Sequence, residues 1–321
     1  MRKFSIIIPV YNRPDEIDEL LDSLTRQTYQ NFEVIVVEDG STIPCKEVIE
    51  KYLQRLDLAY FEKKNEGQGF ARNYGYERAE GDYFIVFDSD CLIPPDYLEE
   101  VNRSLNLNYL DAYGGPDRAH PSFTPVQKAI SHSMTSFLTT GGTRGNKKGI
   151  GPFHPRSFNM GISPEVFKKT GGYIMPFKGE DIEFSIRINK TGFKTGLIPG
   201  AYVYHKRRTS WLKFYKQLHF FGTARINIAR YYPDQLKPVH FFPMLFTLGL
   251  LLLVLTYPFS RFIFYVLLSL YLLFSLLLFG EAYLQQKRLK IAVMSVWAGF
   301  IQLTAYGTGF MQEGIKRILK G

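Results

Sequence analysis

Two acidic residues, Asp88 and Asp90, follow directly on the apolar run at positions 83–87. An unbroken run of aromatic and β-branched residues is typical of a strand buried on both faces. Side chains two apart on a strand point to the same side, and open α/β sheets bind ligands at the carboxyl ends of their strands. Neighbouring carboxylates repel unless a cation lies between them, and their oxygens suit Mg²⁺ or Mn²⁺. Taken alone, the triplet Asp88-Ser89-Asp90 is equally typical of a polar turn.

A second acidic pair, Glu180 and Asp181, stands at the predicted start of a helix that runs through Asn189. The helix dipole favours carboxylates at this end, so a purely structural role is the alternative. The same dipole keeps a carboxylate ionised, which a general base requires. Since neighbouring helical side chains diverge by about 100°, only one of the two can face a given substrate hydroxyl.

The sequence also predicts the sheet and the helices that would position these residues. Apolar runs of strand character alternate with amphipathic segments of helical period, which predicts an α/β fold with a mostly parallel, doubly wound sheet. The predicted strands are Phe4–Val10, Phe32–Glu38, Leu58–Lys63 and 83–87, and helices are predicted to begin near Asn12, at Gly67 and at Pro95.

The composition of the 321-residue chain changes along its length. Residues 1–208 have the mixed composition of a globular domain, whereas the chain beyond residue 238 is largely apolar. The apolar run near the N-terminus is short and leads into charged residues, so it predicts a buried strand and not a signal peptide. Two cysteines, Cys45 and Cys91, make no disulfide framework, which fits a reducing compartment.

The net charge of +9 is concentrated at residues 194–237, where nine Lys and Arg against one acid, Asp234, leave a local charge of +8. Aromatic residues alternate with these cations. Such interleaving occurs in nucleic-acid-binding proteins, but here it leads directly into hydrophobic segments. We therefore predict that residues 209–238 form an interface with anionic lipid headgroups and that no nucleic acid is bound.

Residues 239–321 are a predicted membrane region. The segments 239–257 and 262–280 are each long enough to cross a hydrocarbon core of ~30 Å, and the short turn between them predicts a tight hairpin. The third segment, 291–311, contains Gln302 and Thr304, and the sequence leaves open whether it spans, re-enters or lies at the interface. Basic residues at 287, 288 and 290 fit a cytoplasmic loop. In the middle of the chain, the glycine-rich segment 141–151 is either a solvated loop or, as we expect, a lid over an anionic ligand.

Several short motifs occur in a set order between residues 4 and 208. They are SIIIPVYNR at 5–13, VVEDGS at 36–41, GQGFARNYG at 67–75, FDSD at 87–90, NMG at 159–161, GED at 179–181, and His205 with the basic run after it. With these motifs the chain resembles the family-2 glycosyltransferases, which are inverting enzymes of GT-A fold that use nucleotide-sugar donors. The resemblance makes residues 1–208 the expected catalytic domain.

The resemblance implies a role for each matched residue. Asp181 is the expected catalytic base, and Glu180 and Asn159 are expected to bind the acceptor. The expected ligands of a divalent metal, Mn²⁺ or Mg²⁺, are Asp90, Asp88 and His205, although a lone His after a strand is more often structural. The expected donor-binding residues are Pro9, Tyr11, Asp39, Arg72, Asp88, Ser89 and Asp90.

Two departures from the family pattern affect these expectations. Cys91 stands where an acid is common, so the metal preference can differ. Gln217 is followed by Leu-His-Phe-Phe and not by the Arg-Trp of processive polymer synthases, which argues against chain extension.

Together these features predict a membrane-anchored glycosyltransferase of cell-surface polysaccharide or glycolipid synthesis, with its catalytic domain facing the cytoplasm, where nucleotide sugars are made. The predicted donor is a UDP-sugar in preference to a GDP-sugar. The predicted acceptor is a lipid-linked saccharide, because a soluble acceptor gives no reason to hold the site at a bilayer. The alternatives are transfer to a polyprenyl phosphate and a non-catalytic, nucleotide-sugar-binding membrane scaffold. The oligomeric state is not predicted.

Overall fold

The computed structural model describes residues 1–141 and 153–319. These residues form two compact units. The first contains residues 1–120 and 153–206, and the second contains residues 121–141 and 207–319. Apart from Gly141, the predicted lid at 141–151 lies outside the described residues.

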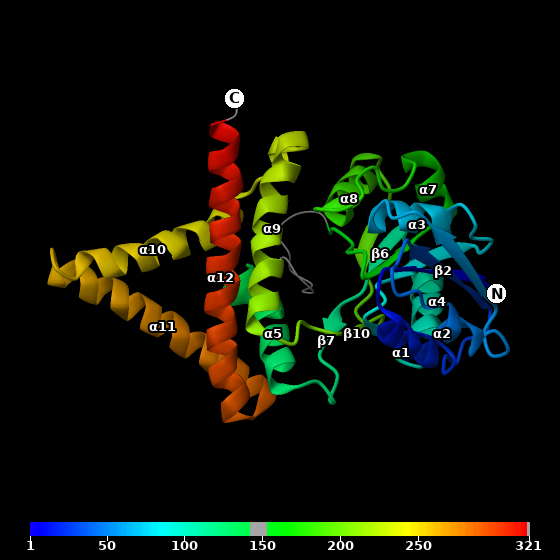
Figure 1. Ribbon diagram of the computed structural model, residues 1–321, viewed down its shortest axis with the longest axis horizontal. Coiled ribbons are helices and arrows are strands. Elements are labelled where there is room, and N and C mark those ends of the chain that lie inside the picture. Colours follow the sequence, from blue (N-terminus) through cyan, green and yellow to red (C-terminus); the bar gives the residue numbers. More distant parts are fainter. Residues whose placement is uncertain (142–152, 320–321) are drawn as a thin grey trace. The chain divides into compact units, whose positions relative to one another are not determined.

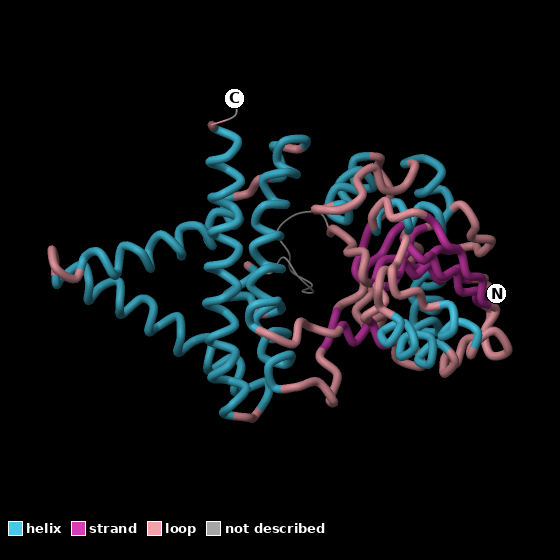
Figure 2. Tube along the Cα trace, in the orientation of Figure 1, coloured by secondary structure: helices cyan, strands magenta, loops and turns pink. Residues whose placement is uncertain are grey.

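A seven-stranded sheet with strand order β3-β2-β1-β4-β8-β6-β9 forms the centre of the first unit (Figures 1 and 2). Only β8 runs antiparallel to its neighbours in this sheet, so the predicted α/β fold with a mostly parallel sheet is confirmed. The strands are β1 (Phe4–Val10), β2 (Phe32–Asp39), β3 (Leu58–Lys63), β4 (Tyr83–Phe87), β6 (Ala112–Gly114), β8 (Asn159–Ile162) and β9 (Thr195–Leu197).

Helices cover both faces of this sheet, as a doubly wound fold requires. Alternate side chains of β1 face opposite ways: Ile6 and Ile8 belong to the hydrophobic cluster that includes α1 and α4, and Ile7 belongs to the cluster that includes α3, α7 and α8. The helices of this unit are α1 (Pro14–Leu24), α2 (Lys46–Glu50), α3 (Gln68–Tyr76), α4 (Tyr97–Leu107), α7 (Pro164–Thr170) and α8 (Glu180–Lys190).

Strand β4 lies in the middle of the sheet and is buried along its whole length. Phe87 is its last residue and pairs with Asn159 of β8, so Asp88 and Asp90 follow at the carboxyl edge. A second, three-stranded sheet then brings distant residues to the same place. Its strands are β5 (Cys91–Leu92), β10 (Val203–His205) and β7 (Asp117–Arg118), and His205 pairs with Cys91.

The second unit is helical, and the long helix α12 lies at its centre (Figure 1). Helices α9, α5, α10 and α11 all pack against α12. Sequence patterning had placed residues 125–140 with the catalytic domain, whereas here they pack with the C-terminal helices. The helices are α5 (Pro125–Thr135), α6 (Phe137–Thr140), α9 (Trp211–Tyr231), α10 (Phe242–Thr256), α11 (Arg261–Gln286) and α12 (Leu289–Ile318), with short 3-10 turns η1 (Pro233–Gln235) and η2 (Pro238–Phe241).

Three helical segments of this unit are long and apolar enough to cross a membrane: Pro238–Thr256, Arg261–Gln286 and Leu289–Ile318. They differ in how far the unit itself covers them. The apolar windows of the first two are 17% and 6% buried, whereas that of the third is 44% buried. The predicted hairpin thus corresponds to α10 and α11, which expose apolar side chains over most of their length, while α12 doubles as the packing centre of the unit.

Helix α9 carries much of the basic-aromatic stretch, and its apolar face is occupied by α12. Phe214, Leu218 and Ile228 are buried in this helix. A side chain at Gly222 would place its Cβ 2.2 Å from the carbonyl oxygen of Tyr306, so the two helices pack backbone to backbone. The remaining side of α9 exposes Lys213 and Lys216 together with the apolar side chains of Leu212 and Phe220.

Candidate active site

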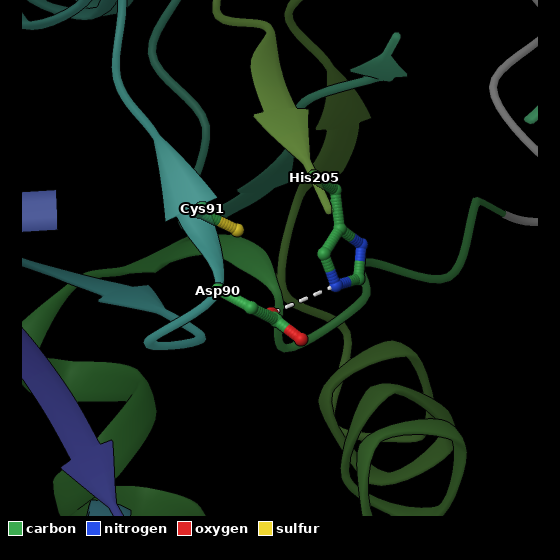
Figure 3. Close-up of side chains that lie close together, drawn as sticks. All are labelled: Asp90, Cys91 and His205. Atoms are coloured by element: carbon green, nitrogen blue, oxygen red, sulfur yellow. Dashed lines mark ion pairs between the residues drawn. The ribbon is translucent and has the colours of Figure 1, made fainter. Parts of the chain in front are cut away.

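Asp90 lies close to two cationic or ionisable side chains, Arg13 and His205. Figure 3 shows the Asp90–His205 pair. Arg13, which follows β1, donates from Nη1 to Asp90 Oδ2 at 2.8 Å. His205, at the end of β10, brings its Nε2 to 3.0 Å from Asp90 Oδ1. Although burial alone would raise it, the pKa of Asp90 is lowered by His205 and Arg13. Asp90 is therefore an ionised carboxylate held at the edge of the sheet.

The residues around Asp90 fit a divalent cation. Ligand atoms of Asp90, Cys91 and His205 lie within 4.8 Å of one another. Asp90 Oδ1 is buried and faces His205 Nε2 at 3.0 Å, so this carboxylate oxygen and this ring nitrogen would both be available to one cation. Asp117 Oδ2 lies 4.0 Å from His205 Nδ1, too far for a hydrogen bond, so His205 has a second carboxylate nearby. Burial raises the pKa of the Cys91 thiol well above its usual range, so the thiol stays protonated and is not expected to bind the metal. The remaining ligand atoms are the carboxylate oxygens of Asp90 and the ring nitrogen of His205, which suit Mn²⁺ or Mg²⁺.

Arg72 joins the two acidic motifs. Its guanidinium is fully buried and donates from Nη2 to Asp88 at 2.8 Å and from Nη1 to Glu180 at 3.2 Å. Glu180 also accepts a hydrogen bond from the Gln68 amide. Burial would lower the pKa of Arg72, but the charges of Asp88 and Glu180 raise it. A single guanidinium group thus contacts both the turn after β4 and the start of α8.

Asp181 is the more accessible member of the second acidic pair. Its side chain is 22% exposed, whereas that of Glu180 is 5% exposed. Burial and the neighbouring charge of Asp181 raise the pKa of Glu180, partly offset by Arg72. On its open side Asp181 lies 3.4 Å from Nη1 of Arg156. Asp181 is thus the more accessible of the two, and its role as the base that meets the substrate stays a prediction.

Two residues expected to bind substrate have buried side chains that are engaged elsewhere. Asn159 is fully buried, donates to the Ala201 carbonyl at 2.8 Å and accepts from the Tyr97 hydroxyl. Glu180 is occupied by Arg72 and Gln68. In this structure both side chains hold parts of the site together, and their contact with an acceptor stays a prediction.

The residues expected at the donor base lie around the ends of β1 and β2. The carboxylate of Asp39 accepts the backbone N–H groups of Glu66 and Gly67 at 3.0 and 2.9 Å and pairs with Lys63 at 3.1 Å. Pro9 is buried within β1, and Ser89 is buried in the turn after β4. Tyr11 is 50% exposed and is free to stack on a planar ligand. These donor contacts remain predictions.

Arg13 and Arg156 were not assigned a role from the sequence. Arg13 belongs to the first motif, directly after the first strand, and its place at the carboxyl edge beside Asp90 follows from the parallel pairing of β1 and β4. The parallel pairing of these two strands is the signal from which the position of Arg13 could be predicted. Arg156 belongs to no helix or strand predicted from the sequence, so no periodicity in the sequence connects it with Asp181.

Comparison with known proteins decides the family. Residues 5–171, about half of the chain, match the sequence profile of "Glycosyl transferase family 2". The protein belongs to glycosyl transferase family 2. The motifs at the sheet edge are thus those of a glycosyltransferase, and the predicted enzyme class is confirmed.

Named relatives agree with this assignment. An uncharacterised glycosyltransferase of Haemophilus influenzae is 31% identical over 189 residues, covering 57% of this chain and 61% of that protein. The poly(ribitol-phosphate) beta-N-acetylglucosaminyltransferase TarS of Staphylococcus aureus is 36% identical over 115 residues, covering 35% of this chain and 20% of TarS. An uncharacterised glycosyltransferase of Rickettsia bellii is 44% identical over 97 residues, covering 30% of this chain and 14% of that protein. The matches span less than two thirds of the length of each relative.

Solved structures share the fold. The mannosyltransferase PcManGT of Pyrobaculum calidifontis, in complex with GDP-Man and Mn²⁺, superimposes with a TM-score of 0.67 at 16% identity, covering 97% of this chain and 87% of PcManGT. Residues 1–349 of Staphylococcus aureus TarS, in complex with UDP-GlcNAc, give a TM-score of 0.51 at 21% identity, covering 98% of this chain and 92% of that one. The GT-A fold of the catalytic unit is therefore shown by structure as well as by sequence.

Proposed function

We propose that this family-2 enzyme transfers one sugar from a nucleotide-diphosphate sugar to a lipid-linked saccharide, with inversion at the anomeric carbon. The observation that carries the proposal is the double contact of Arg72, which holds the Asp88 turn and the start of α8 together. Asp90, the proposed metal ligand, is two residues from Asp88, and Asp181, the proposed base, follows Glu180, so the contact supports a metal ligand and a base acting at one site. Both are needed for a single displacement at a sugar carbon.

In this mechanism Asp181 accepts the proton of the acceptor hydroxyl. The hydroxyl oxygen forms its bond to the anomeric carbon, the bond from that carbon to the diphosphate oxygen breaks, and the nucleoside diphosphate leaves with the bonding electrons. Asp90 and His205 would hold a divalent metal, which neutralises the departing diphosphate as a Lewis acid. Arg72 keeps Asp88 and Glu180 in place, and Tyr11 stacks on the nucleotide base.

Three features support a lipid-linked acceptor and a cytoplasmic active site. The second unit offers three helical segments able to cross a membrane, so the catalytic unit is tethered where lipid-linked saccharides reside. The basic residues Lys287 and Arg288 lie between α11 and α12, where the positive-inside rule places cytoplasmic loops. Nucleotide sugars are made in the cytoplasm. We propose a UDP-sugar as donor in preference to a GDP-sugar, with Mn²⁺ or Mg²⁺ as the metal.

A donor panel and analysis of the product test this function. The purified full-length protein is incubated with UDP- and GDP-sugars, Mn²⁺ and membrane lipid extract, and nucleoside-diphosphate release is measured. We expect release with one donor class and an acid-stable glycosidic bond in the lipid product. An acid-labile sugar would instead identify a polyprenyl phosphate as the acceptor. Donor binding without any transfer would identify a non-catalytic scaffold.

Loss of an outer partner of a metal ligand typically costs 10–100-fold in metal affinity. Replacing the proposed ligand Asp90 itself by Ala is therefore expected to weaken the metal-dependent binding of UDP or GDP by at least about 100-fold. Calorimetric titration of the nucleotide with and without Mn²⁺ measures this. Cys91→Ser is the matched control and should leave the affinity nearly unchanged, since it retains Asp90 and His205. Equal nucleotide affinity of the wild type with and without metal would contradict the proposed metal site.

The exposed side of α9, which carries Lys213 and Lys216, is expected to contact anionic lipid. Because α9 packs on α12, a chain cut before Val239 would lose that cover, so the test requires the full-length protein. Of its two tryptophans, Trp297→Phe leaves Trp211, at the start of α9, as the only reporter. We expect its emission in nanodiscs to depend on anionic lipid, to lose this dependence at high salt, and to lose it in Lys213→Glu/Lys216→Glu, since each cation contributes about 1 kcal/mol at such a surface. Identical emission in zwitterionic and anionic discs would exclude the contact.

A further inference from the structure

Arg156 lies next to the expected base but is loosely held there. Its Nη1 is 3.4 Å from Asp181 Oδ2, and both side chains are 22% exposed. Its backbone is fixed, because its carbonyl accepts the N–H of Asn159 at the start of β8. Among the described residues, Asp181 is the only side chain to which the guanidinium donates a hydrogen bond.

This contact is weaker than the other arginine contacts of the site. Charge-assisted hydrogen bonds between nitrogen and oxygen are usually about 2.7–2.9 Å long, and the bonds from Arg72 and Arg13 to their aspartates are both 2.8 Å. A single long contact between partly exposed groups contributes little to stability. Arg156 therefore retains most of its N–H donors, arranged in the planar fork that matches phosphate and carboxylate oxygens.

The stereochemistry of the proposed reaction places Arg156 on the acceptor side. In a single displacement the attacking and leaving oxygens lie on opposite faces of the anomeric carbon. Asp181 must contact the attacking hydroxyl, so Arg156, in contact with Asp181, lies within a few atoms of the acceptor. The leaving diphosphate belongs on the other face, with Asp90 and His205.

The Arg156 guanidinium and the acceptor hydroxyl would both approach the carboxylate of Asp181. The hydroxyl has fuller access to that carboxylate once Arg156 has another partner. An oxyanion on the acceptor would supply that partner, since it can take both arms of the guanidinium where Asp181 takes one.

We propose that the acceptor carries a phosphate-type anion beside its reacting hydroxyl and that Arg156 binds this anion, leaving Asp181 free to accept the proton. The proposal rests on the proposed function and adds the charge of the acceptor. Arg156 exchanges one ionic partner for another and forms no covalent bond. The acceptor hydroxyl still gives its proton to Asp181 and its oxygen to the anomeric carbon, and the nucleoside diphosphate still leaves.

The test uses matched pairs of small acceptors with the full-length enzyme and its preferred donor. The pairs are glycerol with glycerol 3-phosphate and methyl glucoside with its 6-phosphate, and kcat and KM are obtained from nucleoside-diphosphate release. We expect the phosphorylated member to be favoured about 10- to 100-fold, as charge-assisted hydrogen bonds allow, mainly through KM. Arg156→Gln should reduce the preference to near unity. Arg156→Lys should retain part of the preference, because lysine keeps the positive charge but lacks the planar fork of N–H donors. Arg55→Gln is the matched control, because Arg55 contacts Thr25 and Asp22 on the surface, and should leave the preference unchanged.

Binding of glycerol 3-phosphate to the protein with UDP or GDP and Mn²⁺, measured by calorimetry, gives a readout that does not need turnover. We expect Arg156→Gln to abolish this binding. An unchanged preference and unchanged binding in Arg156→Gln would overturn the proposal while leaving glycosyl transfer intact. Loss of nucleotide affinity alone would place Arg156 on the donor and also overturn it. Absence of transfer to any acceptor, with phosphate binding retained and dependent on Arg156, would overturn the proposed function but not this inference.

Discussion

Asp181→Asn is expected to reduce turnover by about 10²–10⁴-fold, the usual contribution of proton transfer by a positioned side chain. Asparagine keeps the shape and the polar start of α8 but cannot accept the proton of the acceptor hydroxyl. The affinity for donor and metal should barely change, because in the proposed mechanism Asp90 and His205 serve the donor side and Asp181 serves the acceptor side. Nucleoside-diphosphate release at saturating donor measures turnover, and calorimetry measures the affinity.

Asp15→Asn is the matched control for this substitution. Asp15 is an exposed acid in the first turn of α1, so the same change removes the same helix-dipole contact without touching the site. Its turnover should equal that of the wild type. Glu180→Gln serves a different purpose, since Glu180 is buried against Arg72. Its main effect should be a lower free energy of unfolding, with only a small effect on turnover. Near-normal transfer by Asp181→Asn together with loss of transfer in Glu180→Gln would identify Glu180 as the base.

The local elements of the site could be predicted because each is encoded within a few neighbouring residues. The strand at 83–87 is continuously apolar and is followed directly by Asp88, and the helix at Glu180 begins with acids after Gly179, whose φ of 100° suits glycine. Burial on both faces and helix-start chemistry are local signals. The predicted position of both motifs, one at a sheet edge and one at a helix start, agrees with the structure.

The contacts between these elements could not be predicted. Arg72 and Glu180 are 108 residues apart, and no periodicity tells which arginine will neutralise a buried acid. Patterning likewise could not assign α5 to its unit. An amphipathic helix with Ala129 and Ile130 on its buried face can cover a sheet or another helix equally well, and only the tertiary structure pairs it with α12.

Arg72→Met is expected to destabilise the catalytic unit by about 3–5 kcal/mol, because removing one partner of a buried ion pair leaves the other uncompensated. Glu180 would keep the hydrogen bonds from the Gln68 amide and the Gly179 N–H but lose its cationic partner, whereas Asp88, 30% exposed, can still be solvated. Thermal unfolding of the purified protein in detergent measures the loss. Arg78→Met is the control: Arg78 lies 3.4 Å from the centre of the Tyr74 ring at the partly exposed end of α3, and should cost only about 0.5–1 kcal/mol.

The double variant Arg72→Met/Glu180→Gln separates loss of packing from loss of charge balance. If the cost of Arg72→Met arises from the unpaired Glu180 carboxylate, removing that charge should recover a large part of the stability, and the two effects will not add. Activity should remain low in the double variant, because Asp88 and the start of α8 are no longer tied to one group. Additive losses of stability would mean that Arg72 acts through its packing on Tyr173, 5.3 Å from the ring centre, and not as the charge that joins the two halves of the active site.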